Sequence, residues 1–164
     1  MCMCVIILNG PAGVGKTTVA KLLAQKSKSS ICIHGDSLRG MIMSRSGSEE
    51  GRLGYRNGAM LIDNFKRAGY DLVIFDYIFP SSEHVTFFLS LLRDASLVSV
   101  FTLWAEEKTV HDRRRGRNRE DVRCSVVDSY RELQSNLHEF KMIIETDDRS
   151  PEQVSDDIWN RMHV

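Results

Sequence analysis

The residues with the clearest chemical pattern lie near the N-terminus. Residues 10–17 read GPAGVGKT, match the spacing G-x-x-x-x-G-K-[ST], and stand between an apolar run and a helix-like segment. Glycines let the chain turn tightly so that several N–H groups converge, and the start of a helix adds partial positive charge. This combination predicts a cradle for the phosphate groups of a nucleotide.

Individual residues of this cradle have distinct expected tasks. Lys16 is long enough to reach the β- and γ-phosphates, and the hydroxyl of Thr17 can bind a magnesium ion that bridges them. Thr18 either contacts the α-phosphate or packs against its neighbours. The other contacts to the nucleotide are expected from Gly10, Ala12, Gly13, Val14 and Gly15. The alternative is a plain glycine-rich turn with an exposed lysine, whereas a dinucleotide fingerprint is excluded because the spacing G-x-G-x-x-G is missing.

A second polar group follows the next apolar run, in the stretch ICIHGDSLRG. Asp36 stands at the end of a predicted strand, where its carboxylate could accept a hydrogen bond from a hydroxyl group and then take its proton. Arg39 comes one helical turn later, where it would face the same side and could bind an anionic or hydroxylated substrate. The alternative for Asp36 is a purely structural helix cap.

A third polar residue, Asp76, ends the apolar stretch LVIFDY. A carboxylate at this place can hold magnesium, usually through water. Tyr77 follows it, and we expect this residue to bind substrate as part of the wall of an acceptor pocket. The alternatives are an aspartate that caps a turn and a tyrosine that packs in the core.

Arginines are concentrated in the stretch HDRRRGRNRED. Five of them fall within seven residues, at positions 113, 114, 115, 117 and 119. Arginines that close over phosphate groups stabilise the charge that spreads over the oxygens during phosphoryl transfer. Arg113 and Arg117 are the pair that we expect to do so, with Arg119 as a further candidate. One alternative is a solvated basic turn. Another is contact with the end of a nucleic acid, but the lack of interleaved aromatic residues disfavours nucleic-acid binding.

Apolar runs rich in β-branched and aromatic residues alternate with longer amphipathic segments. The runs predict parallel strands with helices on both faces of the sheet, because they are apolar almost throughout. The predicted strands are residues 5–8, 31–33, 72–75, 97–103 and 142–144. The predicted helices are residues 15–27, 53–68, 82–92, 106–114, 120–140 and 151–162. Residues 44–54 and 113–121 are expected to be irregular, and Ser150 is expected to cap the last helix.

Length and composition point to one domain of ordinary size. The chain has 164 residues, a formal net charge of zero, and no apolar run near the roughly 18 residues of a membrane span. Its charge therefore favours neither nucleic acid nor a membrane surface as a partner. The N-terminus lacks the features of a signal peptide, and the four cysteines have no CxxC spacing, so a cytoplasmic location is expected.

The glycine-rich motif and the alternation of strands and helices resemble the P-loop nucleoside triphosphate hydrolase superfamily. The stretches HGDSLR and VIFDYIFP and the arginine cluster further resemble its small-molecule and polynucleotide kinases, which include gluconate kinase-like, shikimate kinase-like and chloramphenicol phosphotransferase-like proteins. The resemblance implies a three-layer α/β P-loop kinase fold, with a central parallel sheet of about five strands and an arginine-rich lid over residues 113–121. GTPases are disfavoured because the chain has no N/T-K-x-D motif.

The same resemblance implies a reaction. ATP and Mg²⁺ are the implied cofactors, and the γ-phosphoryl group passes to a hydroxyl of a small molecule of nucleoside, nucleotide, sugar-acid or antibiotic type. In these kinases an Asp-x-x-Arg pattern, here Asp36 and Arg39, orients the attacking hydroxyl, and the carboxylate at the place of Asp76 can also touch substrate. Residues 145–154 resemble the loop that borders adenine. A 5′-hydroxyl polynucleotide kinase and a nucleotide-hydrolysing switch are the alternatives.

Overall fold

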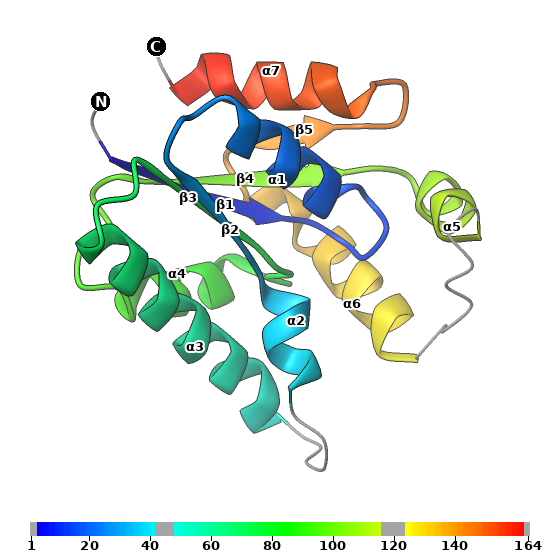
Figure 1. The fold of residues 1–164 in the computed structure, drawn as a ribbon. Helices are drawn as coiled ribbons and strands as arrows, with labels where there is room; N and C mark the ends of the chain where they lie inside the picture. Colours follow the sequence, from blue (N-terminus) through cyan, green and yellow to red (C-terminus); the bar gives the residue numbers. More distant parts are fainter. Residues whose placement is uncertain (1–2, 42–47, 116–123, 163–164) are drawn as a thin grey trace.

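A sheet of five parallel strands forms the centre of the fold (Figure 1). The computed structural model describes residues 3–41, 48–115 and 124–162. The strands follow the order β2-β3-β1-β4-β5 across the sheet. Their bounds are β1 Cys4–Asn9, β2 Ser30–His34, β3 Leu72–Asp76, β4 Val98–Trp104 and β5 Ile143–Glu145. The predicted fold class is confirmed, and every predicted strand end lies within one residue of its observed position.

Helices cover both faces of this sheet. Their bounds are α1 Lys16–Gln25, α2 Gly35–Gly40, α3 Ser48–Arg67, α4 Ser82–Ser90, α5 Glu107–Arg115, α6 Cys124–Ser135 and α7 Pro151–Met162. Figure 1 shows α1 and α7 on one side of the sheet and α3 and α4 on the other. Within the ranges that the structure describes, no helix is long and apolar enough to cross a membrane.

The sheet divides the buried core into two layers. Ile6 of β1 packs on the side of α1, in one cluster with Leu23. Ile7, the next residue of the same strand, packs on the opposite side with Phe88 of α4. All of these side chains are fully buried. Both faces of β1 are therefore apolar, which explains why its sequence reads as a continuous apolar run.

The start of α3 differs from the prediction. Residues 48–54 are helical, so the expectation of an irregular segment over residues 44–54 is wrong for this part, and the rest of that segment lies outside the described residues. The segment contains glycines, which usually weaken a helix. At Gly54, however, a Cβ atom would lie 3.3 Å from the hydroxyl oxygen of Tyr77. The glycine thus lies where α3 passes close to the side chain of Tyr77 and does not mark a loop.

The predicted helix over residues 120–140 is also too long. The structure ends α6 at Ser135 and continues with a short 3₁₀ helix, η1, at Leu137–Glu139. Between them, Nδ2 of Asn136 donates a hydrogen bond of 3.2 Å to the main-chain oxygen of Pro80. This tertiary contact stands where the helix ends, and the sequence pattern alone does not show it.

The arginine cluster is only partly described. Its first members, residues 113–115, belong to α5. The predicted helix over residues 106–114 is therefore confirmed to within one residue at each end, and the overlapping prediction of an irregular segment is wrong for residues 113–115. Residues 116–121 of the expected lid, which include Arg117 and Arg119, lie outside the described residues.

Candidate active site

The carboxyl ends of β1, β2 and β3 bring the predicted site residues together. The three strands are neighbours, and their register places His34 beside Asp76, and Asp76 beside Leu8. The glycine-rich loop follows β1, and α2, which carries Asp36, follows β2. This edge of an open parallel sheet is where ligands bind in many α/β proteins. The parts that the sequence predicts separately thus follow strands that end at one edge of the sheet.

The glycine-rich loop is fixed at its start by Asn9, the last residue of β1. Its Oδ1 accepts hydrogen bonds from the main-chain N–H groups of Gly10, at 2.7 Å, and Phe79, at 2.8 Å. Its Nδ2 donates to Oγ1 of Thr102 at 3.2 Å. Sequence reasoning missed this residue, although a polar side chain at the end of an apolar run is the signal that could have found it. A fully buried amide with these partners holds the loop in place.

The backbone conformation of the loop explains why glycine stands at three of its positions. Gly10, Gly13 and Gly15 all have positive φ, which other residues adopt only with strain. At Gly10 a Cβ atom would also lie 2.4 Å from the main-chain oxygen of Leu103. Gly15 precedes α1, and no side chain caps the first turn of that helix. The main-chain N–H groups at the start of α1 are therefore suited to bind the oxygens of an anion.

The side chain of Lys16, the first residue of α1, reaches back to the glycine-rich loop. Its Nζ donates hydrogen bonds to the main-chain oxygens of Gly10, at 2.7 Å, and Pro11, at 3.0 Å. Burial lowers the pKa of the ammonium group, and the negative charges of Asp36 and Asp76 act in the opposite direction. Both carboxylates are thus close enough to influence the lysine. The predicted cradle and the two predicted aspartates share one electrostatic environment.

Asp76 is buried at the end of β3, with 3% of its surface exposed. Nδ1 of His34 is 2.8 Å from Oδ2 of this carboxylate. Because a carboxylate only accepts hydrogen bonds, the Nδ1 atom is the donor. His34 was not identified from the sequence, because the partners of a histidine at a strand end depend on which strand lies beside it.

Asp36 and Arg39 are both exposed on the short helix α2. Asp36 is in its first turn and Arg39 in its last. Among the described residues, the guanidinium of Arg39 has no hydrogen-bond or ion-pair partner. Neither does the carboxylate of Asp36. Both side chains are therefore accessible to a solute.

The residues present suit a magnesium ion that is bound together with phosphate groups. Thr17 is exposed in the first turn of α1, and Thr18 is half-buried beside it. Among the residues that the structure describes, no three His, Cys, Asp or Glu side chains cluster into an all-protein metal site. Magnesium usually keeps several waters and takes one or two protein ligands beside phosphate oxygens. Asp76 and Thr17 match this donor set.

Tyr77 lies in the core next to the site. Only 4% of its surface is exposed, and its ring forms an edge-to-face contact with Tyr55, with ring centres 5.5 Å apart. On the other side it meets the start of α2, where a Cβ on Gly35 would lie 2.2 Å from ring atom Cδ2. Tyr77 thus supports the helix that carries Asp36.

Arg113 binds main-chain oxygens on two sides of the site. Its Nη1 donates to the oxygen of Val14 in the glycine-rich loop at 3.3 Å and to Oγ1 of Thr146 at 3.0 Å. Its Nη2 donates to the main-chain oxygen of Thr146 at 2.6 Å. Arg114 packs its aliphatic stem against Gly13. Both arginines therefore contact the glycine-rich loop from α5.

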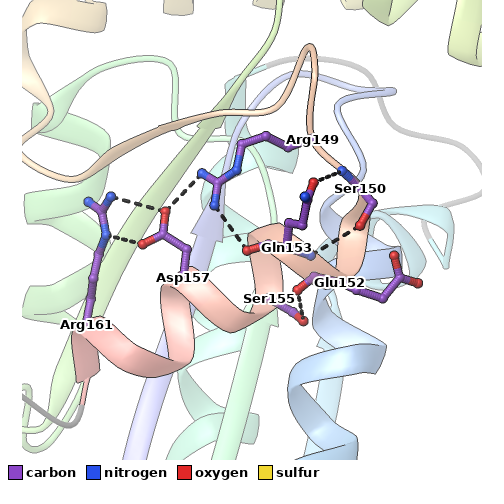
Figure 2. A network of polar contacts seen from close by, with 7 residues as sticks. All are labelled: Arg149, Ser150, Glu152, Gln153, Ser155, Asp157 and Arg161. Carbon is purple, nitrogen blue, oxygen red and sulfur yellow. Dashed lines mark hydrogen bonds and ion pairs between the residues drawn. The ribbon is translucent and has the colours of Figure 1, made fainter.

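The loop that follows β5 is fixed by a polar network at the start of α7 (Figure 2). Oγ of Ser150 accepts a hydrogen bond from the N–H of Gln153, and the side chain of Gln153 accepts one from the N–H of Ser150. This reciprocal pair is a capping box, so the predicted cap is confirmed. Asp157 accepts hydrogen bonds from Arg149 and Arg161, which hold its pKa below the usual range.

Comparison with known structures gives chains of the same fold over their full length. The tunicamycin resistance protein of Deinococcus radiodurans matches with 25% identity and a TM-score of 0.71, covering 99% of this chain and 96% of that one. The shikimate kinase of Bacteroides thetaiotaomicron matches with 17% identity and a TM-score of 0.69, covering 99% and 100%.

A structure of the Mycobacterium tuberculosis APS kinase in complex with AMPPNP and APS matches with 16% identity and a TM-score of 0.69, covering 99% of both chains. No curated protein matches the sequence. The resemblance to P-loop kinase-like proteins is confirmed by these structures together with a family model. That model describes an AAA domain and matches residues 5–137, which is most of the chain. The protein therefore belongs to this AAA domain family.

Proposed function

We propose that the protein is an ATP-dependent kinase that transfers the γ-phosphoryl group to a hydroxyl of a small molecule. One observation carries the proposal: two aspartates, Asp76 at the end of β3 and Asp36 in the helix that follows β2, lie at the edge of the sheet where the glycine-rich loop follows β1. A phosphate-binding loop alone would suit a slow hydrolase or a switch. An exposed carboxylate at the same edge of the sheet, that of Asp36, adds a group that can receive the proton of an acceptor.

On the donor side, the N–H groups of the glycine-rich loop and the ammonium of Lys16 would hold the β- and γ-phosphates. Thr17 and Asp76 would hold magnesium, which supplies charge neutralisation on the phosphate oxygens when bound. The residues after β5, next to Thr146, would border the adenine. Support for ATP comes from the APS kinase, whose structure contains AMPPNP.

On the acceptor side, Asp36 would orient the attacking hydroxyl and receive its proton. The acceptor oxygen forms a bond to the γ-phosphorus while the bond from that phosphorus to the bridging oxygen of the β-phosphate breaks, leaving ADP. Arg39 would bind a polar or anionic part of the acceptor. Tyr77, through the packing described above, would shape the wall behind it.

Arginines from α5 and the segment that follows it would stabilise charge during transfer. Arg113 and Arg117 are the candidates, because guanidinium groups pair well with phosphate oxygens. For Arg113 this role requires its guanidinium to leave the main-chain oxygens that it binds in the structure. We further propose that the reaction takes place in the cytoplasm, in keeping with a fold whose described helices include none that could span a membrane.

The test is a screen for compounds that stimulate ATP consumption. Nucleosides, sugar acids, aminoglycoside-like antibiotics and 5′-hydroxyl oligonucleotides form the panel, and the phosphorylated product is identified by mass spectrometry. We expect Lys16→Ala and Asp36→Asn each to abolish transfer, and Asp36→Asn to keep ATP binding nearly intact. Stimulation only by oligonucleotides would instead indicate a polynucleotide kinase. Slow turnover with every compound would support a switch, and full transfer by Asp36→Asn would exclude this residue as the base.

A further inference from the structure

His34 is the residue that connects the two aspartates of the site. It is the last residue of β2, it lies beside Asp76 in the sheet, and its backbone forms the N-cap of α2, the helix that carries Asp36. Its side chain points to Asp76, with Nδ1 at 2.8 Å from Oδ2. One residue therefore touches the carboxylate of one strand and sets the start of the helix that holds the other.

The hydrogen bond from His34 determines which oxygen of Asp76 remains for other partners. Oδ2 accepts from the imidazole, and the part of the chain that the structure describes makes no hydrogen bond to Oδ1. A buried carboxylate that is held at one oxygen by a fixed donor cannot rotate freely. In metal sites, donors that hold a ligand in this way contribute strongly to metal affinity.

We propose that His34 is a positioning residue that holds Asp76 in the orientation in which it supports magnesium beside the nucleotide phosphates. This rests on the proposed function only as far as Asp76 and Thr17 hold the metal together with a nucleotide. It assigns the imidazole no contact with either. The action of His34 passes through Oδ2 of Asp76.

The experiment measures the affinity for AMPPNP by calorimetry with and without Mg²⁺. The readout is the ratio of the two dissociation constants, which reports how much magnesium strengthens binding. We expect His34→Ala to reduce this ratio about tenfold, as is usual when a residue behind a metal ligand is lost. The affinity for metal-free AMPPNP should stay within about twofold of the unchanged protein. His34→Asn keeps an N–H donor near the position of Nδ1 and should restore most of the ratio.

The matched control is His111→Ala. Nδ1 of His111 lies 3.9 Å from Oδ1 of Asp112, and both side chains are exposed on α5. This variant removes an imidazole beside a carboxylate that is not expected to bind magnesium. We expect it to leave the magnesium ratio unchanged. A similar loss in His111→Ala would contradict a specific role of His34.

A double variant separates positioning from a general loss of structure. If His34 acts through Asp76, adding His34→Ala to Asp76→Asn should not lower the ratio further, because the shared partner is already changed. Independent, multiplicative losses would overturn the proposal, as would an unchanged ratio in His34→Ala. All variants are compared below their own melting temperatures. The acceptor screen tests a separate point. If the magnesium ratios change as expected but no compound stimulates ATP consumption, the role of His34 stands and only the kinase proposal is refuted.

Discussion

Arg113 binds both oxygens of Thr146, the residue that follows β5. Nη1 donates to the side-chain oxygen at 3.0 Å, and Nη2 donates to the main-chain oxygen at 2.6 Å. The hydroxyl of Thr146 in turn donates to the main-chain oxygen of Trp104 in β4 at 3.1 Å. With its further contact to Val14, the guanidinium connects α5, the glycine-rich loop and the end of the sheet. This makes it a structural link between segments far apart in the sequence.

Replacing Arg113 should therefore destabilise the protein. Arg113→Met leaves main-chain oxygens without their donor, and we expect a loss of about 1–3 kcal/mol in the free energy of unfolding, measured by urea denaturation. Arg115→Met, at an exposed position of the same helix, is the control and should change it by less than about 0.5 kcal/mol. Equal effects of the two variants would show that the contacts of Arg113 contribute little.

Gly58 should not tolerate a side chain, because α3 packs closely on β3 there. A Cβ at this position would lie 2.7 Å from ring atom Cζ of Phe75, which is fully buried. We expect Gly58→Ala to lower the free energy of unfolding by about 1–3 kcal/mol through overpacking, despite the higher helix propensity of alanine. Gly40→Ala is the control, since no atom lies within 4 Å of its Cβ position in α2. It should be neutral or slightly stabilising, and the prediction for Gly58 fails if both variants behave alike.

The capping box of α7 should contribute measurably to stability. Ser150→Ala removes the acceptor for the N–H of Gln153, and we expect a loss of about 0.5–2 kcal/mol in thermal or urea unfolding. Ser135→Ala is the control, because that hydroxyl only donates to the main-chain oxygen of Arg131, one turn earlier in α6. A smaller loss at Ser150 than at Ser135 would contradict the role of the cap.

The thiol of Cys32 should react slowly in the folded protein. Burial, and then the negative charge of Asp76, raise its pKa to about 11. At pH 8 a thiol with this pKa has about 100-fold less thiolate than one near 9, and thiolate is the reactive form. Alkylation by iodoacetamide, followed by peptide mass spectrometry, should be at least that much slower than in urea. Asp76→Asn should lower the pKa of Cys32 and speed its alkylation. If the folded protein, without this substitution, reacts within tenfold of the rate in urea, the raised pKa is contradicted.

The sheet and the glycine-rich loop could be predicted because their sequence signals are local. A strand that is buried on both faces is apolar throughout, and the spacing of Gly10, Gly15 and Lys16 is tied to one backbone path. The first turn of α7 could be predicted equally well, because Ser150 stands directly before the helix and Pro151 is its first residue. In these segments the structure depends mainly on residues that are close together in the sequence.

The remaining features depend on contacts between distant residues. The partners of His34 and Asn9 lie far away in the sequence. His34 meets Asp76 because β2 and β3 are neighbours in the sheet, and Asn9 binds the main chain of Phe79. The sequence does not show which strands are neighbours, so it does not show these contacts. The arginine cluster looks uniform in the sequence, yet Arg113 binds main-chain oxygens, Arg114 packs against a glycine and Arg115 is exposed. Such differences follow from the position of α5 and not from residue type.

The strand order has a consequence for engineering. β1 stands at the centre, β2 and β3 lie on one flank, and β4 and β5 lie on the other. The chain completes the first flank before it begins the second, so each flank is one contiguous stretch of sequence. A graft of the stretch from β2 to α4, taken from another chain of this fold, would exchange Asp36 and Asp76 together with their surroundings and leave the partners of Arg113 untouched. Chimaeras in which this part of the candidate site comes from another chain are therefore accessible with two crossover points.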